Sequence, residues 1–147
     1  MLRSMAPSPV IPSVIRSILA VIAGYAALVL GVGVFLAFLL FLFPGAFPSE
    51  PGPYTGPAWI LLLELAFSGL VAIGGGYLCG LVAGRAELKH ALVLVGLMTV
   101  LGLVSAMFEA GLKPLWSSLA MPVVGGLGVI LGAKLRQRHR ERRALER

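Results

Sequence analysis

The sequence predicts an all-α, polytopic membrane protein in which four transmembrane helices form one bundle. Of the 147 residues, 59% are hydrophobic and only 12% are charged, which is about half the charged fraction of a typical soluble domain. The apolar residues also gather into four long segments separated by short polar or proline-rich stretches. Irregular backbone in lipid would leave N–H and C=O groups unpaired, so each spanning segment should be helical. The length of the chain fits a single domain.

The first apolar segment covers residues 17–43 and carries no charge. It exceeds the roughly 20 residues that a helix needs to cross the hydrocarbon core. A secretory signal peptide has a shorter apolar region, of about 7 to 15 residues, and ends at a small-residue cleavage site that this segment lacks. We therefore predict a retained first membrane helix. The next stretch, 44–57, is rich in proline and glycine and should be a loop.

Three further apolar segments follow the loop. The second segment is interrupted by a single charge, Glu64, and compact polar turns separate the later segments. The four predicted helices cover about residues 17–43, 58–83, 91–108 and 115–133. Together they make one transmembrane domain, residues 1–136, and residues 137–147 form a basic tail.

The basic residues predict the orientation of the bundle. All 12 Lys and Arg residues except Lys113 lie in the N-terminal segment, in the turn 84–90 or after residue 133. The positive-inside rule places these regions in the cytoplasm. We therefore expect a multi-pass protein of the cell membrane with both termini, including the tail 137–147, in the cytoplasm.

The basic C-terminal region indicates contact with lipid. Its positive charges adjoin apolar spans, so they are typical of topology rather than of a nucleic-acid groove, and we expect no nucleic acid as a partner. Anionic lipid headgroups attract such residues by about 1 kcal/mol each near the surface. The region is expected to anchor the topology, with a protein-partner site as the alternative.

Helical wheels of the second and fourth segments separate small from large side chains. Small residues let backbones approach closely where lipid provides no hydrophobic drive for helices to associate. The predicted helix-packing face consists of Ser68, Ala72, Gly76, Gly80, Gly125, Gly128 and Gly132. The spacing Gly76-x3-Gly80-x3-Gly84 resembles a glycine zipper. Packing within the chain is the first interpretation of this face, and a homodimer is the alternative.

Glu64 is the one ionisable residue well inside a predicted span. It lies about two turns from the N-terminal end of its helix, roughly 10 Å inward. An acid at mid-helix costs on the order of 2.5 to 3.5 kcal/mol on insertion scales, which neighbouring leucines offset. Glu64 is either a proton or cation site, or a structural carboxyl that hydrogen-bonds across the bundle or reaches a water-filled vestibule. No second charge within the spans supplies a relay, so the structural interpretation is favoured.

No constellation of residues indicates catalysis, a cofactor or a metal, and none of the three is expected. His90 and His139 flank the spans, whereas haem ligands in a bilayer would lie inside facing helices. Cys79 is the single cysteine and should be a small packing residue. Pro122 is expected to kink the fourth helix, as a static packing feature or alternatively as a hinge.

Several short motifs occur in order between about residues 60 and 136: Gly75–Arg85, Lys89-His90-Ala91, Pro114-Leu115-Trp116 and Lys134-Leu135-Arg136. This series resembles a loose class of small uncharacterised bacterial four-helix integral membrane proteins. The resemblance implies a bacterial origin, hence the inner membrane, and the four-helix fold, but no activity. Small multidrug transporters also have four helices and one membrane glutamate, but their acid lies in the first helix, whereas Glu64 lies in the second.

The leading functional hypothesis is a non-enzymatic structural or accessory membrane protein that acts through helix-helix association with copies of itself or with a larger membrane partner. The alternative is a small proton- or cation-coupled transporter or channel that works as an oligomer around Glu64. An enzyme ranks below both, because catalysis needs several convergent polar groups. A polar pair within the bundle would favour transport.

Overall fold

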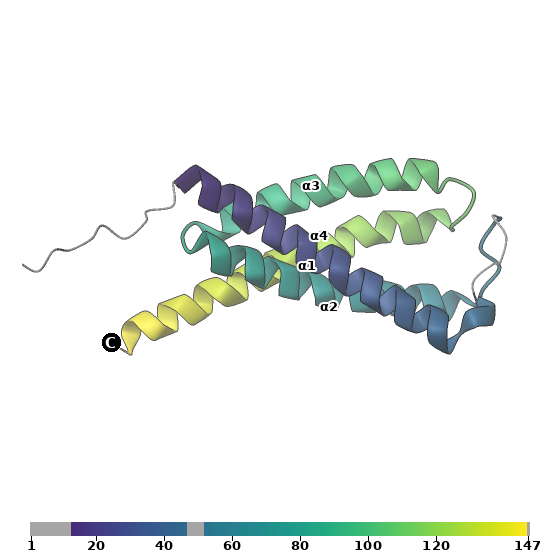
Figure 1. Cartoon of the computed structure of the whole chain (residues 1–147), viewed down its shortest axis with the longest axis horizontal. Helices are drawn as coiled ribbons and strands as arrows, with labels where there is room; N and C mark the ends of the chain where they lie inside the picture. The colour runs from purple at the N-terminus through teal and green to yellow at the C-terminus, as the bar shows by residue number, and fades with distance from the viewer. Residues whose placement is uncertain (1–12, 47–51, 147) are drawn as a thin grey trace, which may run out of the picture.

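The computed structural model describes residues 13–46 and 52–146, and this part of the chain is all-helical with no strands, which confirms the predicted fold class. The helices are α1 (Ser13–Leu42), α2 (Ala58–Ala83), α3 (Glu87–Phe108) and α4 (Leu115–Leu145), and a short 3-10 turn, η1 (Pro44–Ala46), follows α1. All four α-helices are long and apolar enough to cross a membrane. The chain is thus a four-helix bundle of the multi-pass membrane type (Figure 1).

Three helix ends lie several residues beyond the predicted ones, and each extension runs through charged residues that flank the apolar span. α2 has the predicted bounds, but α1 and α3 begin before residues 17 and 91, and α4 continues past residue 133 to Leu145. Residues 137–145 of the predicted tail are therefore a helical continuation of α4, and Arg147 lies outside the described residues. The physical reason is that Glu, Lys, Arg, Gln, Leu and Ala all favour helix, so a charge ends an apolar span without ending the helix.

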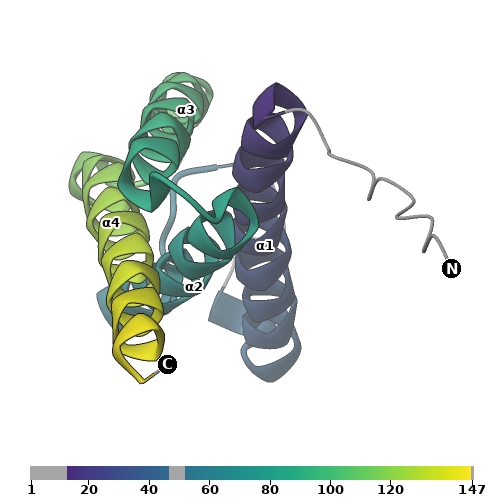
Figure 2. The same ribbon diagram turned by 90° about the vertical axis from the view of Figure 1, so that its left-hand side faces the viewer.

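α2 is the central helix of the bundle. It packs most extensively against α4 on one side and against α1 on the other, while α3 packs chiefly against α4. The end-on view shows the same order, with α2 between α1 and α4 and with α3 above α4 (Figure 2). We refer to the end with the N-terminus of α1, the α2–α3 turn and the C-terminal part of α4 as the basic end. The opposite end, with residues 52–57 and the α3–α4 turn, is the loop end.

Glycines bring the backbones of α2 and α4 into contact. A Cβ atom at Gly76 would overlap the carbonyl oxygen of Val129, and one at Gly132 would overlap the carbonyl oxygen of Ile73. A Cβ atom at Gly128 would come within 2.7 Å of the carbonyl oxygen of Gly69. Because both helices contribute glycines and carbonyl groups, the contact is reciprocal, and neither helix can carry a larger residue at these points.

Two apolar clusters surround this contact. The larger cluster joins all four helices and contains Ala20, Leu28, Ala72, Cys79, Ala83, Ala91, Leu94, Val129 and Ala133. The smaller cluster fastens α1 to α2 at the loop end through Phe35, Leu39 and Ile60, and the Phe35 ring stacks on Phe67 with a centroid separation of 3.8 Å. The buried residues of α3, namely Glu87, Ala91 and Leu94, all lie in its first part. The loop-end half of α3 is thus packed much less than its beginning.

The contact between α2 and α4 gives a direct test with a matched control. Gly76→Ala should lower the free energy of unfolding by about 1–3 kcal/mol, the usual range for overpacking, since the new methyl group meets backbone that cannot rotate away. Gly74 lies on the same helix with no atom within 4 Å of its ideal Cβ position. Gly74→Ala should therefore leave stability unchanged or raise it by up to about 1 kcal/mol. Unfolding in mild detergent measures both, and equal effects of the two variants would contradict the packing described.

Candidate functional site

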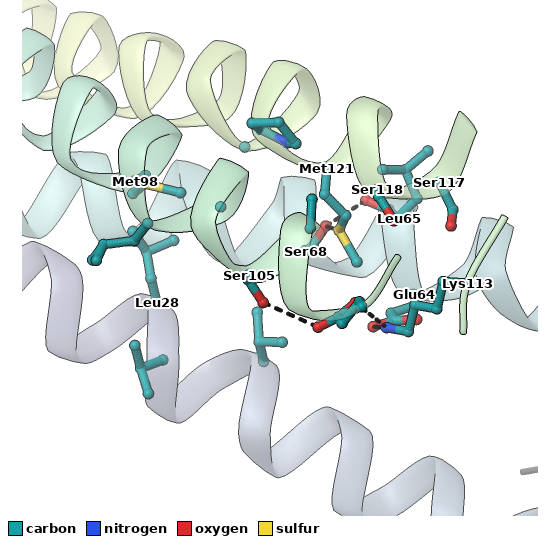
Figure 3. A pocket seen from close by; sticks show the side chains of 18 of the residues that line it. Leu28, Glu64, Leu65, Ser68, Met98, Ser105, Lys113, Ser117, Ser118 and Met121 are labelled. Atoms are coloured by element: carbon teal, nitrogen blue, oxygen red, sulfur yellow. Dashed lines mark hydrogen bonds and ion pairs between the residues drawn. The ribbon is translucent and has the colours of Figure 1, made fainter. Parts of the chain in front are cut away.

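A cavity of about 490 Å³ lies among the four helices toward the loop end (Figure 3). Every helix contributes to its walls, with apolar residues such as Leu28 of α1 and Met98 of α3. Its polar lining residues are Glu64, Ser68, Ser105, Glu109, Lys113, Ser117 and Ser118. The cavity therefore combines an apolar interior with a group of charges, an arrangement typical of small-molecule sites.

Glu64 faces this cavity and has a basic neighbour. The Lys113 Nζ atom lies 3.6 Å from Glu64 Oε1 and 3.9 Å from Glu109 Oε2. The Glu64 side chain is 10% exposed, whereas those of Lys113 and Glu109 are 36% and 39% exposed. Glu64 is thus the buried member of the group, and the ammonium reaches it from the α3–α4 turn.

The two carboxylates of the cavity are held to different degrees. Glu109 is fixed by a second contact, since Ser105 Oγ donates a hydrogen bond of 3.0 Å to Glu109 Oε1. Within the described residues Glu64 accepts no hydrogen bond, and its distance to Lys113 exceeds that of a charge-assisted hydrogen bond. One ammonium therefore serves two carboxylates, which leaves negative charge in excess when all three groups are ionised.

The other polar groups of the lining come mainly from α2 and α4. Ser68 Oγ donates to the Leu65 carbonyl oxygen at 2.9 Å and lies 3.3 Å from the sulfur of Met121. Pro122, expected to kink α4, lies inside a continuous helix and lines the cavity. Proline has no N–H, so the carbonyl group of Ser118 loses its helical donor and remains free to accept another hydrogen bond.

Tyr54 connects the loop before α2 to the α3–α4 turn, which carries Lys113. Its backbone N–H donates to the carbonyl oxygen of Leu112 at 2.7 Å, and its hydroxyl group donates to the carbonyl oxygen of Pro57 at 3.2 Å. Desolvation by burial and, to a smaller extent, the negative charge of Glu64 raise the pKa of the Tyr54 phenol above its usual value of 10.0. The phenol is therefore neutral at neutral pH.

The residues predicted to form the packing face lie between helices. On α2, Ser68, Ala72, Gly76 and Gly80 are all buried. Gly80 faces Glu87 and Arg136, so the three glycines of the zipper-like spacing meet different parts of the same chain. The residues of this face on α4 are also buried and lie against α2 or α3: Gly125, Gly128 and Gly132.

The other residues considered from the sequence lie away from the cavity. Cys79 is buried in the larger apolar cluster. His90 contacts the carbonyl oxygen of Ala86 and the hydroxyl group of Ser17, each at 3.0 Å, while His139 lies 3.3 Å from the Tyr77 hydroxyl group. Among the described residues, no group of three or more His, Cys, Asp or Glu side chains is placed to hold a metal ion.

Sequence reasoning missed a buried ion pair at the basic end. Glu87 is 2% exposed, and its Oε1 atom lies 2.8 Å from Arg140 Nη1. The same Nη1 atom donates a hydrogen bond of 2.9 Å to the Gly84 carbonyl oxygen. Glu87 Oε1 accepts no hydrogen bond among the described residues, so its contact with Arg140 is an ion pair. The sequence spacing could have indicated this pair. Gly132, Arg136 and Arg140 recur every four residues, so the two arginines continue the packed face of α4.

Comparison of the chain with family models, curated proteins and solved structures finds no match.

The buried ion pair predicts a measurable coupling. Arg140→Gln should lower stability by about 1–3 kcal/mol, because it leaves the Glu87 carboxylate buried without its closest cation. Glu87→Gln removes the charge that Arg140 compensates, so the double variant should be more stable than the sum of the two single losses implies, by about 0.5–3 kcal/mol. Unfolding of the four proteins in mild detergent completes the cycle. Glu141→Gln, an exposed change on the same helix, is the control, and strict additivity of the Glu87 and Arg140 effects would contradict the pairing.

Proposed function

We propose that the protein is a small proton- or cation-coupled membrane transporter or channel that works around Glu64. The observation that carries this proposal is the position of Glu64, which faces a cavity shared by all four helices and has Lys113 as its nearest cation. Ionisable side chains that face a cavity inside a helical membrane protein commonly mark an ion or substrate pathway. A polar pair within the bundle favours transport over a structural role. The sequence alone did not indicate such a pair, whereas the structure brings Lys113 close to Glu64.

The loose geometry of the pair supports exchange with a ligand. At 3.6 Å the ammonium attracts Glu64 without occupying it through a short hydrogen bond, and Lys113 is exposed enough to move into solvent. A proton or another cation can therefore replace Lys113 at Glu64 without the loss of a tight internal contact. The cavity belongs to one chain, so the proposal does not require the oligomer expected from the sequence.

The structural or accessory role stays an alternative proposal. The predicted helix-packing face is occupied by contacts within the chain, at Gly76, Gly128 and Gly132 for example. Apolar side chains such as Phe41 and Phe108 are exposed, as expected for membrane helices whose outer surface contacts lipid. These features give the accessory role no specific support, and we propose no enzymatic activity.

The charge distribution supports an orientation for the bundle. Arg16, Arg85, Lys89 and the basic residues of α4 gather at the basic end, while Lys113 lies at the loop end. We propose that the basic end lies in the cytoplasm of a bacterial cell, against the anionic headgroups of the inner membrane. The cavity then lies toward the outer side of that membrane.

Cysteine labelling tests this orientation. Thr55 and Arg143 are both exposed, and the native Cys79 is buried, so single cysteines at the two exposed positions can be followed separately. In intact cells, a membrane-impermeant maleimide should label Thr55→Cys and spare Arg143→Cys until the membrane is permeabilised. Labelling of both positions from the same side would exclude four spans.

Ion flux tests the proposed role of Glu64. In proteoliposomes the native chain should show a cation or proton flux that depends on pH, and Glu64→Gln should lower it at least about tenfold, because an amide cannot take up or release the proton or bind the cation as a carboxylate does. Glu141→Gln removes an acid from the exposed face of α4 and should leave the flux unchanged.

Thermal unfolding of the same samples separates function from folding. The proposal requires Glu64→Gln to unfold close to the native temperature while its flux is lost. Absence of flux from the native chain, combined with a change of stability or association state in Glu64→Gln, would favour the accessory role instead.

A further inference from the structure

The cavity is open on one side of the bundle, between α1 and α3. These helices meet near the basic end, where a Cβ atom at Gly24 would come within 2.8 Å of Leu94 Cδ2. They diverge toward the loop end (Figure 1), and no residue of α3 beyond Leu94 is buried. Val29 of α1 and Leu101 of α3 line the cavity and are nevertheless 52% and 40% exposed. The seam between the two helices therefore joins the cavity to the surface that faces lipid.

Small residues leave this seam unfilled. Gly33 of α1 and Gly102 of α3 both belong to the cavity lining. An added Cβ atom would find nothing within 4 Å at Gly33, and only Pro122 Cβ, at 3.9 Å, at Gly102. The seam therefore has room for a chain of methylene groups next to either helix.

The polarity of the lining changes along the cavity. The seam is lined by apolar side chains such as Val29 and Leu101, while the carboxylates of Glu64 and Glu109 both lie within ion-pair distance of Lys113. Figure 3 shows Lys113 beside Glu64. A small hydrated cation has no need of the apolar part, and a hydrocarbon chain alone would leave the excess carboxylate charge uncompensated. A molecule that is cationic at one end and apolar at the other satisfies both parts.

We propose that the cavity binds a single-chain amphipathic cation that enters from the bilayer through the seam between α1 and α3. Its ammonium group lies between the carboxylates of Glu64 and Glu109, from which Lys113 withdraws toward solvent, and its alkyl chain lies in the seam. This inference rests on the proposed cation-binding role of Glu64 and adds to it the class of ligand and the route of entry.

Binding of matched probes to the full chain in lipid nanodiscs tests the proposal, with empty nanodiscs subtracted. Dodecyltrimethylammonium should bind saturably. Tetramethylammonium has the same headgroup without the chain and should bind at least about tenfold more weakly, since burial of only two methylene groups gives that factor. Dodecyl sulfate has the same chain with the opposite charge and should show no saturable binding.

Two pairs of variants separate the headgroup site from the seam. Gly102→Leu fills the seam and should weaken dodecyltrimethylammonium binding about tenfold with little effect on tetramethylammonium, whereas Gly96→Leu, also on α3 and in open space but outside the lining, should change neither. Glu64→Gln should weaken both cations, while Glu141→Gln should weaken neither. Thermal unfolding checks that each variant is folded. If Glu64→Gln does not fold, Glu109→Gln, at a more exposed position, replaces it as the headgroup variant.

The outcomes distinguish this inference from the function on which it rests. Equal binding of the two cations, or equal effects of Gly102→Leu and Gly96→Leu, would overturn the amphipathic ligand and the lateral route while leaving cation binding at Glu64 in place. Saturable binding of dodecyl sulfate as strong as that of the cation would overturn the charge selection. Absence of binding for both cations would overturn the amphipathic ligand, while the proposed function stands or falls separately on the pH-dependent flux of the native chain and its loss in Glu64→Gln.

Discussion

The direct contact between the backbones of α2 and α4 is the constraint on which the rest of the bundle depends. Carbonyl groups of each helix lie against glycines of the other, at Gly76, Gly128 and Gly132, and these close contacts fix the two helices as a central pair. Dispersion between touching backbones replaces the hydrophobic drive that lipid cannot supply. α1 then attaches to α2, and α3 attaches mainly to α4. Because the outer helices are held by different members of the pair, they need to meet only toward the basic end, at Gly24 and Leu94 and at Ser17 and His90, and the space between them toward the loop end belongs to the cavity.

Two inward-facing acids, Glu87 and Glu64, lie at opposite ends of the bundle and differ in the distance to their nearest cation. Glu87 is almost fully buried and lies 2.8 Å from Arg140, which also binds the Gly84 carbonyl oxygen. A buried carboxylate with so close a partner cannot lose it without a large desolvation cost. Glu64 borders a cavity, and its cation at 3.6 Å is shared with Glu109. The first pair fastens α4 to the start of α3, whereas the second leaves Glu64 at the wall of a cavity with a cation that it shares.

Much of the fold follows from the sequence, because composition and segment length decide whether a chain must form spanning helices. The bounds of α2 follow from the extent of its apolar segment, and its buried small residues, such as Ser68 and Gly80, follow from a helical wheel. Helix ends are harder to predict, since the residues after Ala133 favour helix as strongly as those before it. The cation near Glu64 could not be predicted from α2 alone, because Lys113 lies in a turn between two other helices and reaches the site only through the way in which α3 and α4 pack.

The ion pair at the basic end has a consequence for the order in which the protein is made. Glu87 leaves the ribosome long before Arg140, which lies near the end of the fourth helix. While α1, α2 and α3 enter the membrane, the acid at the start of α3 does not yet have Arg140 beside it, and Gly76 of α2 does not yet have α4 against it. A chain that stops after the apolar part of α4 would keep all four spans, yet it would lack the Arg140 guanidinium that lies beside the buried Glu87 carboxylate. The turns of α4 around Arg140 therefore complete a contact that the first three helices leave open.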